Sequence, residues 1–351
     1  MSGAAIPPLR LAVIGCGAFG RNHLRVYNAL ATAGEAVHVV AVVDPNAGAR
    51  EAAVREYGLR AFASVEELLA SGLELHAASV CTPTVNHANA AVALLKAGVD
   101  VLIEKPIAPT LEDADRILAA AAEGGRVVQV GHLERFNPAV TAAVPLLHKP
   151  MFFEAHRLSV FTPRSLDVDV VLDLMIHDLD VVLALADAPV REVRAVGLPV
   201  LSREVDIANV RVEFETGAVA NFTASRVSTE RVRKLRFFQP HQYLSLDFAR
   251  QDLLMIDVTA AASLTPQQLE VMFAGSSGEA GTTAPHPSAG LSLRKVPTEP
   301  GEPLRLEIAS FLQCVRTRET PVVSGEAARR ALALALQIQE SIRDHRERSG
   351  L

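Results

Sequence analysis

The stretch Val13-Ile14-Gly15-Cys16-Gly17-Ala18-Phe19-Gly20 decides the fold of the N-terminal part of this chain. It places a G-x-G-x-x-G pattern between an apolar run, Arg10 to Ile14, and a helical stretch, Gly20 to Ala33. Glycines let the backbone turn tightly and approach a pyrophosphate, and the helix that follows offers its N-terminal N–H groups to the phosphates. A glycine-rich turn that only joins a strand to a helix is the alternative. The pattern predicts a dinucleotide-binding turn whose contact residues are Gly15, Gly17, Ala18, Phe19 and Gly20.

An acidic residue supports this prediction. Asp44 ends the next apolar run, Val37 to Val43, and stands 24 positions after Gly20. That is close to the spacing at which a carboxylate meets the 2′-hydroxyl of the bound ribose. Because a carboxylate accepts from a free hydroxyl but repels a 2′-phosphate, NAD is preferred over NADP. Arg50 is near enough in sequence to weaken this preference, although it also fits an ordinary arginine on a helix surface.

Up to about residue 130, short β-branched runs alternate with alanine-rich helical stretches. This order is typical of a doubly wound parallel sheet. We therefore predict a Rossmann domain over residues 1–130. After the two strands and the helix already named, its expected elements are a helix Ala47 to Tyr57, a strand Ala61 to Phe62, a helix Ser64 to Ser71 with a Ser64/Glu67 capping box, a strand Ala77 to Cys81, a helix His87 to Ala97, a strand Asp100 to Ile103, a helix Leu111 to Glu123 and a strand Val127 to Val130.

The pattern changes after residue 131. Two-residue alternation and the turn Thr216-Gly217 indicate a mainly antiparallel sheet. We predict a second, α+β domain over residues 131–351 that binds substrate and mediates oligomerisation, and its last helices can pack back on the first domain. Its expected elements are helices Pro138 to Leu147, Asp173 to Ala186, Pro303 to Arg316 and Gly325 to Arg346, strands Val210 to Glu215, Ala218 to Ala224, Leu235 to Phe238, Tyr243 to Phe248 and Leu253 to Asp257, and a mobile loop Ala274 to Gly290.

Composition narrows the class of protein. The 351 residues have a net charge of −6, which gives no electrostatic footprint for nucleic acid. The basic run Arg231 to Arg236 is interpreted as a solvated sheet face, with a position near an anionic substrate as the alternative. Three scattered cysteines indicate neither a disulfide framework nor a zinc site, so no metal is expected. Because no signal peptide or membrane span is recognisable, the expected location is the cytoplasm.

Two further motifs follow strands of the first domain. Thr82-Pro83-Thr84-Val85-Asn86-His87 comes directly after the strand that ends at Cys81, and Ile103-Glu104-Lys105-Pro106 closes the next strand. Doubly wound sheets bind ligands at the carboxyl ends of their strands. An ammonium group there can hydrogen-bond a carbinol oxygen and stabilise the negative charge that develops during hydride transfer. Lys105 is therefore a candidate catalytic residue, and the predicted cofactor contacts from these motifs are Thr82, Pro83, His87, Glu104 and Lys105.

Taken together, G-x-G-x-x-G, T-P-x-x-x-H and E-K-P resemble the Gfo/Idh/MocA oxidoreductase family, and the resemblance spans nearly the whole chain. It implies a Rossmann domain followed by an α/β domain whose open sheet mediates homodimer or homotetramer formation. The family's E-K-P lysine is implicated in catalysis. Its D-x-G-x-H-x-x-D pattern is matched by Asp173, His177 and Asp180, but Met175 replaces the usual glycine.

The spacing of Asp173 and His177 places both on one face of an otherwise apolar helix. Burial of two ionisable groups is costly unless they pair or line a cleft. We assign His177 as the general base, Lys105 as the group that holds the reacting oxygen, and Asp173 as the residue that orients substrate or His177. A core histidine that is satisfied by Asp173 or by a backbone carbonyl is the alternative.

A second local resemblance concerns the substrate. The run Gly131 to Pro138, with the run Asp167 to Asp178, is similar to members that oxidise the 3-hydroxyl of UDP-N-acetylglucosamine, often for polysaccharide or lipid A synthesis. It implies a UDP-sugar as the small-molecule substrate. Arg135 is a candidate phosphate ligand, with Arg157 and Arg164 as further cations, although each alone also fits an ordinary salt-bridge arginine. The predicted substrate contacts are Lys105, Arg135, Asn137, Arg164, Asp173 and His177.

Three alternative functions stay open at this point. The substrate could be a free polyol such as inositol, and the protein could be a glycosidase that uses tightly held NAD in a cycle of oxidation, elimination and re-reduction. It could also be an NAD-binding regulator without catalysis. Binding of UDP, release of free sugar without net NADH, and the effect of replacing Lys105 or His177 distinguish these possibilities.

Overall fold

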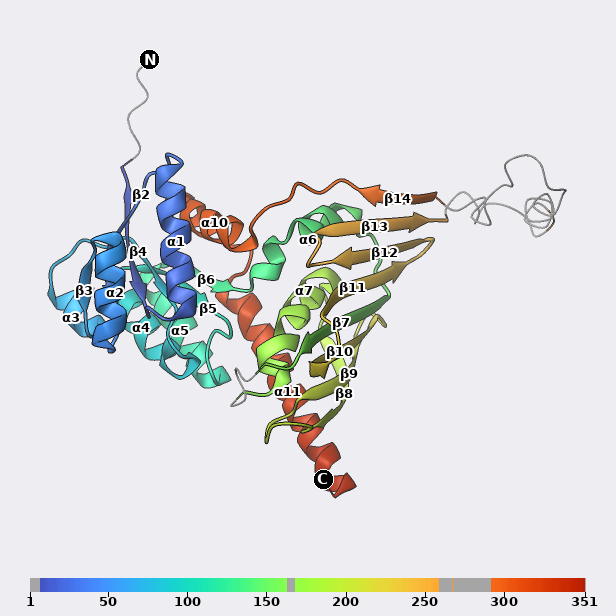
Figure 1. Ribbon diagram of the computed structural model, residues 1–351. Coiled ribbons are helices and arrows are strands. Elements are labelled where there is room, and N and C mark those ends of the chain that lie inside the picture. The colour runs from blue at the N-terminus through green and yellow to red at the C-terminus, as the bar shows by residue number, and fades with distance from the viewer. Residues whose placement is uncertain (1–6, 163–167, 259–266, 268–291, 351) are drawn as a thin grey trace, which may run out of the picture. The chain divides into compact units, whose positions relative to one another are not determined.

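The computed structural model describes residues 7–162, 168–258, 267 and 292–350. The chain forms two compact units (Figure 1). Unit 1 comprises Met1–Phe136 and Gly301–Leu336, and unit 2 comprises Asn137–Pro300 and Gln337–Leu351. The predicted division was 1–130 and 131–351, so unit 1 extends six residues further and also includes Gly301–Leu336.

Unit 1 contains the predicted parallel sheet, whose six strands lie in the order β3-β2-β1-β4-β5-β6. All neighbouring strands are parallel, as a doubly wound fold requires. Strands β4, β5 and β6 are buried along their whole length because helices cover both sides of the sheet, whereas the edge strand β3 is mostly exposed. Their bounds are β1 (Leu9–Ile14), β2 (Val37–Val43), β3 (Arg60–Phe62), β4 (Ala77–Val80), β5 (Asp100–Glu104) and β6 (Val128–Gly131).

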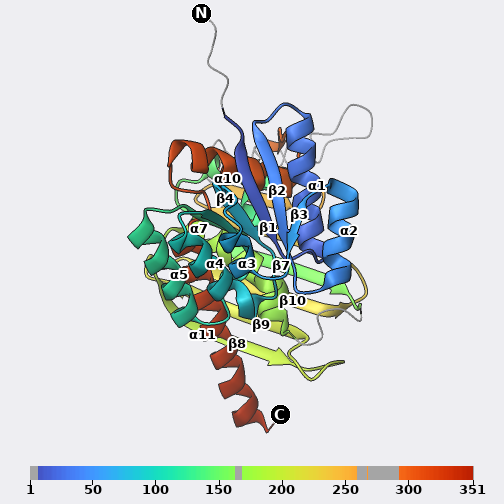
Figure 2. The same ribbon diagram turned by 90° about the vertical axis from the view of Figure 1, so that its left-hand side faces the viewer.

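The helices of unit 1 cover the two faces of this sheet (Figure 2). On one face, Leu24 and Tyr27 pack in the same apolar cluster as Ile308 and Phe311 from the C-terminal part of the chain. Ser64 is confirmed as the N-cap of α3, since its Oγ accepts from Glu67 N at 3.2 Å; Glu67 Oε2 accepts from Ala63 N at 2.9 Å, one residue before the N–H that a capping box uses. The helices are α1 (Ala18–Thr32), α2 (Ala47–Tyr57), α3 (Val65–Ala70), α4 (His87–Lys96), α5 (Leu111–Gly124), α10 (Pro303–Thr317) and the first half of α11 (Gly325–Ser349), with 3-10 turns η1 (Thr84–Asn86) and η2 (Leu133–Phe136).

Unit 2 contains an eight-stranded sheet in the order β14-β13-β12-β11-β7-β10-β9-β8. Only β7 and β10 are parallel neighbours, so the prediction of a mainly antiparallel sheet is confirmed. Gly217, with φ +81°, makes the predicted hairpin turn. The bounds are β7 (Phe152–Val160), β8 (Val190–Leu198), β9 (Ile207–Phe214), β10 (Val219–Ser228), β11 (Val232–Gln239), β12 (Gln242–Asp247), β13 (Asp252–Asp257) and β14 (Ser292–Val296).

Three strands of unit 2 were not predicted: β7, β8 and β14. Charged residues interrupt each of them, and β7 even carries a charged side chain, Arg157, on its buried face. Such strands lack the apolar-polar alternation that identifies a half-buried strand. The predicted loop Ala274 to Gly290 lies outside the described residues.

The helices of unit 2 differ from the prediction in one important place. The helix predicted from Asp173 begins earlier, as a π turn η4 (Val171–Met175) that continues into α7 (Ile176–Ala186). The predicted helix Pro138 to Leu147 is α6 (Pro138–Ala143) followed by a 3-10 turn η3 (Val144–Leu146). The second half of α11 completes the unit. Within the described ranges, no helix is long and apolar enough to span a bilayer.

Candidate active site

The glycine turn of unit 1 has the close backbone packing that its sequence predicts. A Cβ on Gly20 would lie 1.7 Å from the Gly15 carbonyl oxygen, and Gly15 itself has φ +98°. Gly17, the N-cap of α1, has nothing within 4 Å of the position where its Cβ would stand. The Phe19 ring is 49% exposed. The turn therefore leaves open space at the helix N-terminus, which is where a pyrophosphate binds in such folds.

Asp44 is joined to this turn by its side chain. Its Oδ2 accepts from Cys16 N at 2.7 Å, and its Oδ1 accepts from Asn46 N at 2.8 Å. Burial and the Asp44 charge raise the pKa of the Cys16 thiol to about 11, so Cys16 stays neutral. Arg50 donates to the carbonyl oxygens of Asp44 at 2.6 Å and Pro45 at 3.0 Å, so its guanidinium supports the turn at the carboxyl end of β2.

The Thr82-to-His87 motif follows β4, next to the glycine turn. A Cβ on Gly15 would lie 2.6 Å from the carbonyl oxygen of Cys81. Thr82 Oγ1 is buried and has no hydrogen-bond partner among the described residues, whereas Pro83 is exposed. An acceptor or donor of a bound dinucleotide would satisfy that hydroxyl. Together with the open space at Gly17, Thr82 shows that the residues present fit such a cofactor.

His87 has a different position from the one predicted. Its ring is 1% exposed, and Nδ1 and Nε2 each lie 2.9 Å from a backbone carbonyl oxygen, of Pro106 and Thr82 respectively. Burial lowers the pKa of His87, although its hydrogen bonds to carbonyl groups oppose that shift. His87 therefore joins the segments that follow β4 and β5 from the inside of the unit. We regard it as a support for the cofactor edge rather than a cofactor contact.

Glu104 and Lys105 stand at the carboxyl end of β5. The Glu104 carboxylate is buried and lies 2.9 Å from His23 Nε2, and its other oxygen accepts from Lys105 N at 3.3 Å. Burial alone would raise the pKa of Glu104, but interaction with His23 and the positive charge of Lys105 lower it. The Lys105 side chain is half-buried, and the Lys105–Pro106 peptide bond is cis. An ionised Glu104 thus lies beside the ammonium group of the candidate catalytic lysine.

In unit 2, Asp173 lies in the π turn and His177 in the first turn of α7. Both side chains are half-buried, whereas the neighbouring carboxylates Asp178 and Asp180 are 3% and 2% exposed. The helix therefore buries Asp178 and Asp180 more deeply than Asp173 and His177. Asp173 instead lines a cavity of about 380 Å³. Lys105 belongs to unit 1 and His177 to unit 2.

Asp178 has a buried partner that the sequence did not reveal. Arg157 of β7 is 2% exposed and donates from Nε and Nη2 to the two oxygens of Asp178, each at 2.8 Å. Such a bidentate pair fixes α7 against the sheet. Arg157 is thus a structural residue, and of the two interpretations offered for it the salt-bridge arginine is the one that the structure supports.

The remaining predicted substrate contacts differ in their positions. Asn137 is 1% exposed, and its amide caps α6 by accepting from Ala139 N at 3.1 Å while it donates to Phe248 O at 3.0 Å. These bonds give Asn137 a structural role, so we leave it out of the substrate site. Arg135, in unit 1, is half-buried and donates to Val322 O at 3.3 Å. Arg164 lies outside the described residues.

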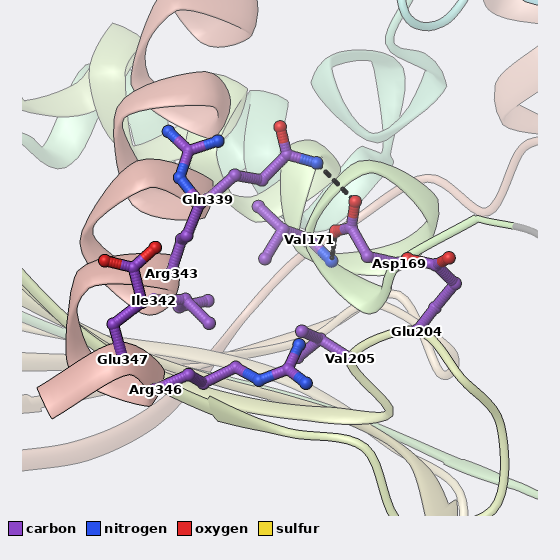
Figure 3. A pocket seen from close by; sticks show the side chains of 9 residues that line it. All are labelled: Asp169, Val171, Glu204, Val205, Gln339, Ile342, Arg343, Arg346 and Glu347. Atoms are coloured by element: carbon purple, nitrogen blue, oxygen red, sulfur yellow. Dashed lines mark hydrogen bonds between the residues drawn. The ribbon is translucent and has the colours of Figure 1, made fainter. Parts of the chain in front are cut away.

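A residue that the prediction did not single out, Asp169, holds the turn that carries Asp173. Its Oδ1 accepts from Val171 N at 2.7 Å and Leu172 N at 3.2 Å, at the start of η4. Gln339 of α11 donates to its other oxygen, as the dashed line in Figure 3 shows. Both residues line a cavity of about 290 Å³ between α11 and η4. Asp169 therefore holds η4, the turn that carries Asp173, in place. Its hydrogen bond to Gln339 joins residues 170 positions apart, so the sequence alone does not predict it.

No group of three or more His, Cys, Asp and Glu side chains within the described ranges is arranged to hold a metal ion. Cys16 and Cys314 are buried and Cys81 is half-buried, and all three are free.

Comparison with known proteins agrees with this geometry. The family description "Oxidoreductase family, NAD-binding Rossmann fold" matches residues 9–132, and "GFO/IDH/MocA C-terminal domain" matches residues 150–239. The chain is 36% identical to UDP-N-acetylglucosamine 3-dehydrogenase of Acidithiobacillus ferrooxidans, over 95% of this chain and 97% of that protein. It is 24% identical to scyllo-inositol 2-dehydrogenase (NAD(+)) of Bacillus subtilis, over 96% and 94% of the two chains.

Solved structures show the same arrangement of elements. The Acidithiobacillus ferrooxidans enzyme superimposes with a TM-score of 0.82 at 35% identity and covers 96% of this chain and 98% of that chain. The WlbA dehydrogenase of Bordetella pertussis, solved with NADH and UDP-GlcNAcA, has a TM-score of 0.73 at 20% identity over 96% and 97% of the two chains, and this likeness concerns the fold alone. The Rossmann domain is NAD-binding, and the chain is an oxidoreductase that belongs to the Gfo/Idh/MocA family.

Proposed function

We propose that the protein oxidises the 3-hydroxyl of a UDP-N-acetylhexosamine, such as UDP-N-acetylglucosamine, to a ketone with NAD as the oxidant. The observation that carries this proposal is the 36% identity, over nearly both full lengths, to a UDP-N-acetylglucosamine 3-dehydrogenase. Asp44 supports NAD over NADP, because its carboxylate at the end of β2 would repel a 2′-phosphate. The inositol dehydrogenase that also matches over its full length is less similar, at 24% identity.

Each proposed catalytic residue has one task. When bound, NAD supplies the acceptor for the hydride that leaves the carbinol carbon. His177 takes the hydroxyl proton, and the Lys105 ammonium hydrogen-bonds the same oxygen and stabilises its negative charge as the C–H bond breaks. Asp173 orients the sugar or the His177 ring. The positive charge of Lys105 is among the causes that lower the pKa of Glu104, so the carboxylate and the ammonium group stabilise one another.

The remaining contacts are assigned by position. We propose that Thr82, Pro83, Glu104 and the glycine turn from Gly15 to Gly20 form the cofactor site. Arg135 and Arg164 stay proposed substrate contacts. A cytoplasmic location and a place in lipopolysaccharide synthesis also stay proposals, supported by the substrate class of the Acidithiobacillus ferrooxidans relative.

The test is to incubate the purified protein with NAD and a panel of UDP-sugars, free N-acetylglucosamine and inositol, and to follow NADH by its absorbance. UDP-N-acetylglucosamine should give the highest kcat/KM. Lys105→Ala and His177→Ala should each lower kcat by roughly 10²- to 10⁴-fold, the usual contribution of a positioned acid or base. Lys96→Ala and His38→Ala, at exposed positions of unit 1, are the matched controls.

Each rival function gives a different result. Turnover of inositol but of no UDP-sugar would replace the proposed substrate with a free polyol. Free sugar released without net NADH would indicate a glycosidase cycle. Equal activity of the wild-type protein and both variants would refute the assigned roles of Lys105 and His177.

We also propose a homodimer or homotetramer formed through the sheet of unit 2. The sheet face opposite α7 carries an aromatic row, with ring centroids of Phe152 and Phe238 5.5 Å apart and those of Phe238 and Tyr243 4.8 Å apart. Phe238 is 37% exposed, and Leu254 on β13 is 41% exposed. A second copy would cover this apolar surface. Phe238→Glu should reduce the mass measured by light scattering, whereas Val85→Glu, in unit 1, should leave the mass unchanged.

A further inference from the structure

Three arginines share a cavity of unit 2 with Asp173. The cavity has a volume of about 380 Å³ and is lined by Ser159, Val160, Thr162, Asp173, Leu174, Arg226, Arg231 and Arg233. Four of these side chains are ionisable, and three of the four are cations. In a chain with a net charge of −6, such a local excess of positive charge needs an explanation.

Strand geometry explains how the arginines reach this cavity. Arg233 of β11 pairs in register with Arg157 of β7 and shares its sheet face with the buried Leu235. Because side chains alternate along a strand, Lys234 and Arg236 point to the opposite face. Arg236 there donates to Glu154 Oε2 at 3.1 Å. The basic run therefore divides into Lys234 and Arg236 on one face and Arg233 on the other, where Arg231 and Arg233 line the cavity. For Arg233, which is half-buried, the solvated interpretation does not hold.

The three cations of the cavity have different environments. Arg226 is 5% exposed, lies 3.7 Å from Asp206 and donates to the carbonyl oxygen of Val168. Its charge is thus balanced within the protein. Arg231 is exposed at the entrance to β11, and Arg233 is half-buried. Arg231 and Arg233 thus bring two guanidinium groups to the cavity wall that also carries Asp173.

The chemistry of the wall identifies the class of ligand. Guanidinium groups are planar and donate two parallel hydrogen bonds, which match the oxygens of a phosphate group. Arg231, directly before β11, and Arg233, within it, line the same cavity, and two such groups can bind two neighbouring phosphates or both sides of one. The volume of about 380 Å³ is in the range of small-molecule sites. Ser159 and Thr162 add hydroxyl groups to the same wall.

We propose that Arg231 and Arg233 bind the diphosphate of a sugar nucleotide, with Arg226 of β10, on the other side of β7, as a positioning residue in the wall of the same cavity. This inference rests on the proposed function, because it assigns the diphosphate of the same substrate to a set of residues. Asp173, in the same cavity, then lies on the side of the ligand where the sugar begins. A free sugar would lack the group that these arginines recognise.

The experiment measures binding of UDP, UMP and uridine by calorimetry to the full chain and to Arg231→Gln, Arg233→Gln and the double variant. We expect each single substitution to weaken UDP binding about tenfold or more, the double substitution to weaken it further, and uridine binding to change little. Lys234→Gln and Arg236→Gln are the matched controls, because they remove the same charge from the other face of the same strand. Unchanged NAD affinity reports that each variant is folded.

Arg233→Lys keeps the charge but not the planar fork, and it should retain intermediate affinity for UDP. This variant also serves if Arg233→Gln does not fold. The KM for UDP-N-acetylglucosamine should rise in the arginine variants by a larger factor than kcat falls.

The proposed function and this inference can fail separately. Turnover of UDP-N-acetylglucosamine with UDP affinity unchanged in the double variant would overturn the inference alone. Arginine-dependent UDP binding without turnover of any UDP-sugar would support the inference and refute the proposed function. Equal loss of UDP affinity in the control variants would also overturn the inference, because it would show a general effect of charge.

Discussion

Nε2 of His23 lies 2.9 Å from Oε1 of Glu104, and both side chains are buried in unit 1. On the other side of the ring, Nδ1 lies 3.0 Å from Ser79 Oγ, which lies 2.8 Å from Tyr27 Oη. Burial raises the pKa of Tyr27, so its phenol is protonated and donates to Ser79. Tyr27 therefore donates to Ser79 Oγ, and His23 Nε2 donates to the ionised Glu104, so one row of hydrogen bonds joins Tyr27, Ser79, His23 and Glu104.

This row predicts the stability of two variants. His23→Leu leaves the Glu104 carboxylate buried without its partner, and it should lower the free energy of unfolding by about 3–5 kcal/mol. Tyr27→Phe removes only the last hydrogen bond of the row, which should cost about 1 kcal/mol. Urea denaturation measures both. If His23→Leu is no less stable than Tyr27→Phe, the row does not support Glu104.

The glycine turn predicts a contrast between two alanine variants. At Gly20 a Cβ would lie 1.7 Å from the Gly15 carbonyl oxygen, whereas at Gly17 it would meet nothing within 4 Å. Gly20→Ala should therefore destabilise unit 1, while Gly17→Ala should keep its melting temperature and lose affinity for NAD because the new methyl group occupies ligand space. Calorimetric melting and NAD titration test this. Unchanged NAD affinity in a folded Gly17→Ala protein would place the pyrophosphate elsewhere.

Cofactor preference should depend on Asp44. Asn at this position keeps an acceptor for Cys16 N but removes the negative charge. Asp44→Asn should lower the ratio of kcat/KM for NAD to that for NADP by about tenfold or more, because repulsion of the 2′-phosphate disappears. Glu35→Gln, also in unit 1, is the control. A ratio unaffected by Asp44→Asn would contradict the assigned ribose contact.

The buried ion pair of Arg157 and Asp178 predicts that a second substitution restores much of the stability that the first one removes. Arg157→Met leaves a carboxylate without compensation and should cost about 3–5 kcal/mol of unfolding free energy, whereas Arg157→Met with Asp178→Leu should recover much of the loss. Denaturation of the single and double variants gives the coupling energy. Because Arg157 is committed to Asp178, the double variant should keep its affinity for UDP; a large loss of that affinity would return Arg157 to the ligand site.

Asp206 predicts a dependence of stability on pH. Its Oδ2 accepts from the N–H groups of Val200 at 2.8 Å, Leu201 at 2.6 Å and Ser202 at 2.8 Å. Burial opposes ionisation, but these hydrogen bonds outweigh it and lower the pKa of Asp206 from 3.8 to about 2. The folded pKa lies below the unfolded one, so the stabilisation is present above about pH 4 and is lost as the pH falls through about 2.

Asp206→Asn should therefore be less stable than wild type by about 2 kcal/mol at neutral pH. The difference in unfolding free energy between wild type and Asp206→Asn should disappear between pH 4 and pH 2, since the wild-type carboxyl becomes protonated there. Urea titrations across this pH range measure it, with Asp344→Asn, at an exposed position of unit 2, as the control. A gap that stays constant with pH would mean that the ionised form is not what the backbone N–H groups stabilise.

Local sequence signals predicted most of unit 1. Strand β2 and helix α2 have the predicted bounds, and α1 begins only two residues before the predicted Gly20. The sequence signals for these elements are hydrophobic periodicity and capping residues, and both involve positions that lie close together in the chain. Strand β8 was missed because Arg191, Glu192 and Arg194 interrupt its apolar pattern, and only its pairing with β9 makes it a strand.

The sequence by itself determined the glycine turn, its order between strand and helix, and the acidic residue at the end of the next strand, because each depends on neighbours a few positions away. The tertiary structure alone decided the partners of the charged groups. His23 and Glu104 stand 81 positions apart, and Arg157 and Asp178 stand 21 apart on different elements. Alternation along β11 separates Arg233 from Lys234, but only the packing of α7 and its neighbours on one face of the sheet decides which of the two is covered.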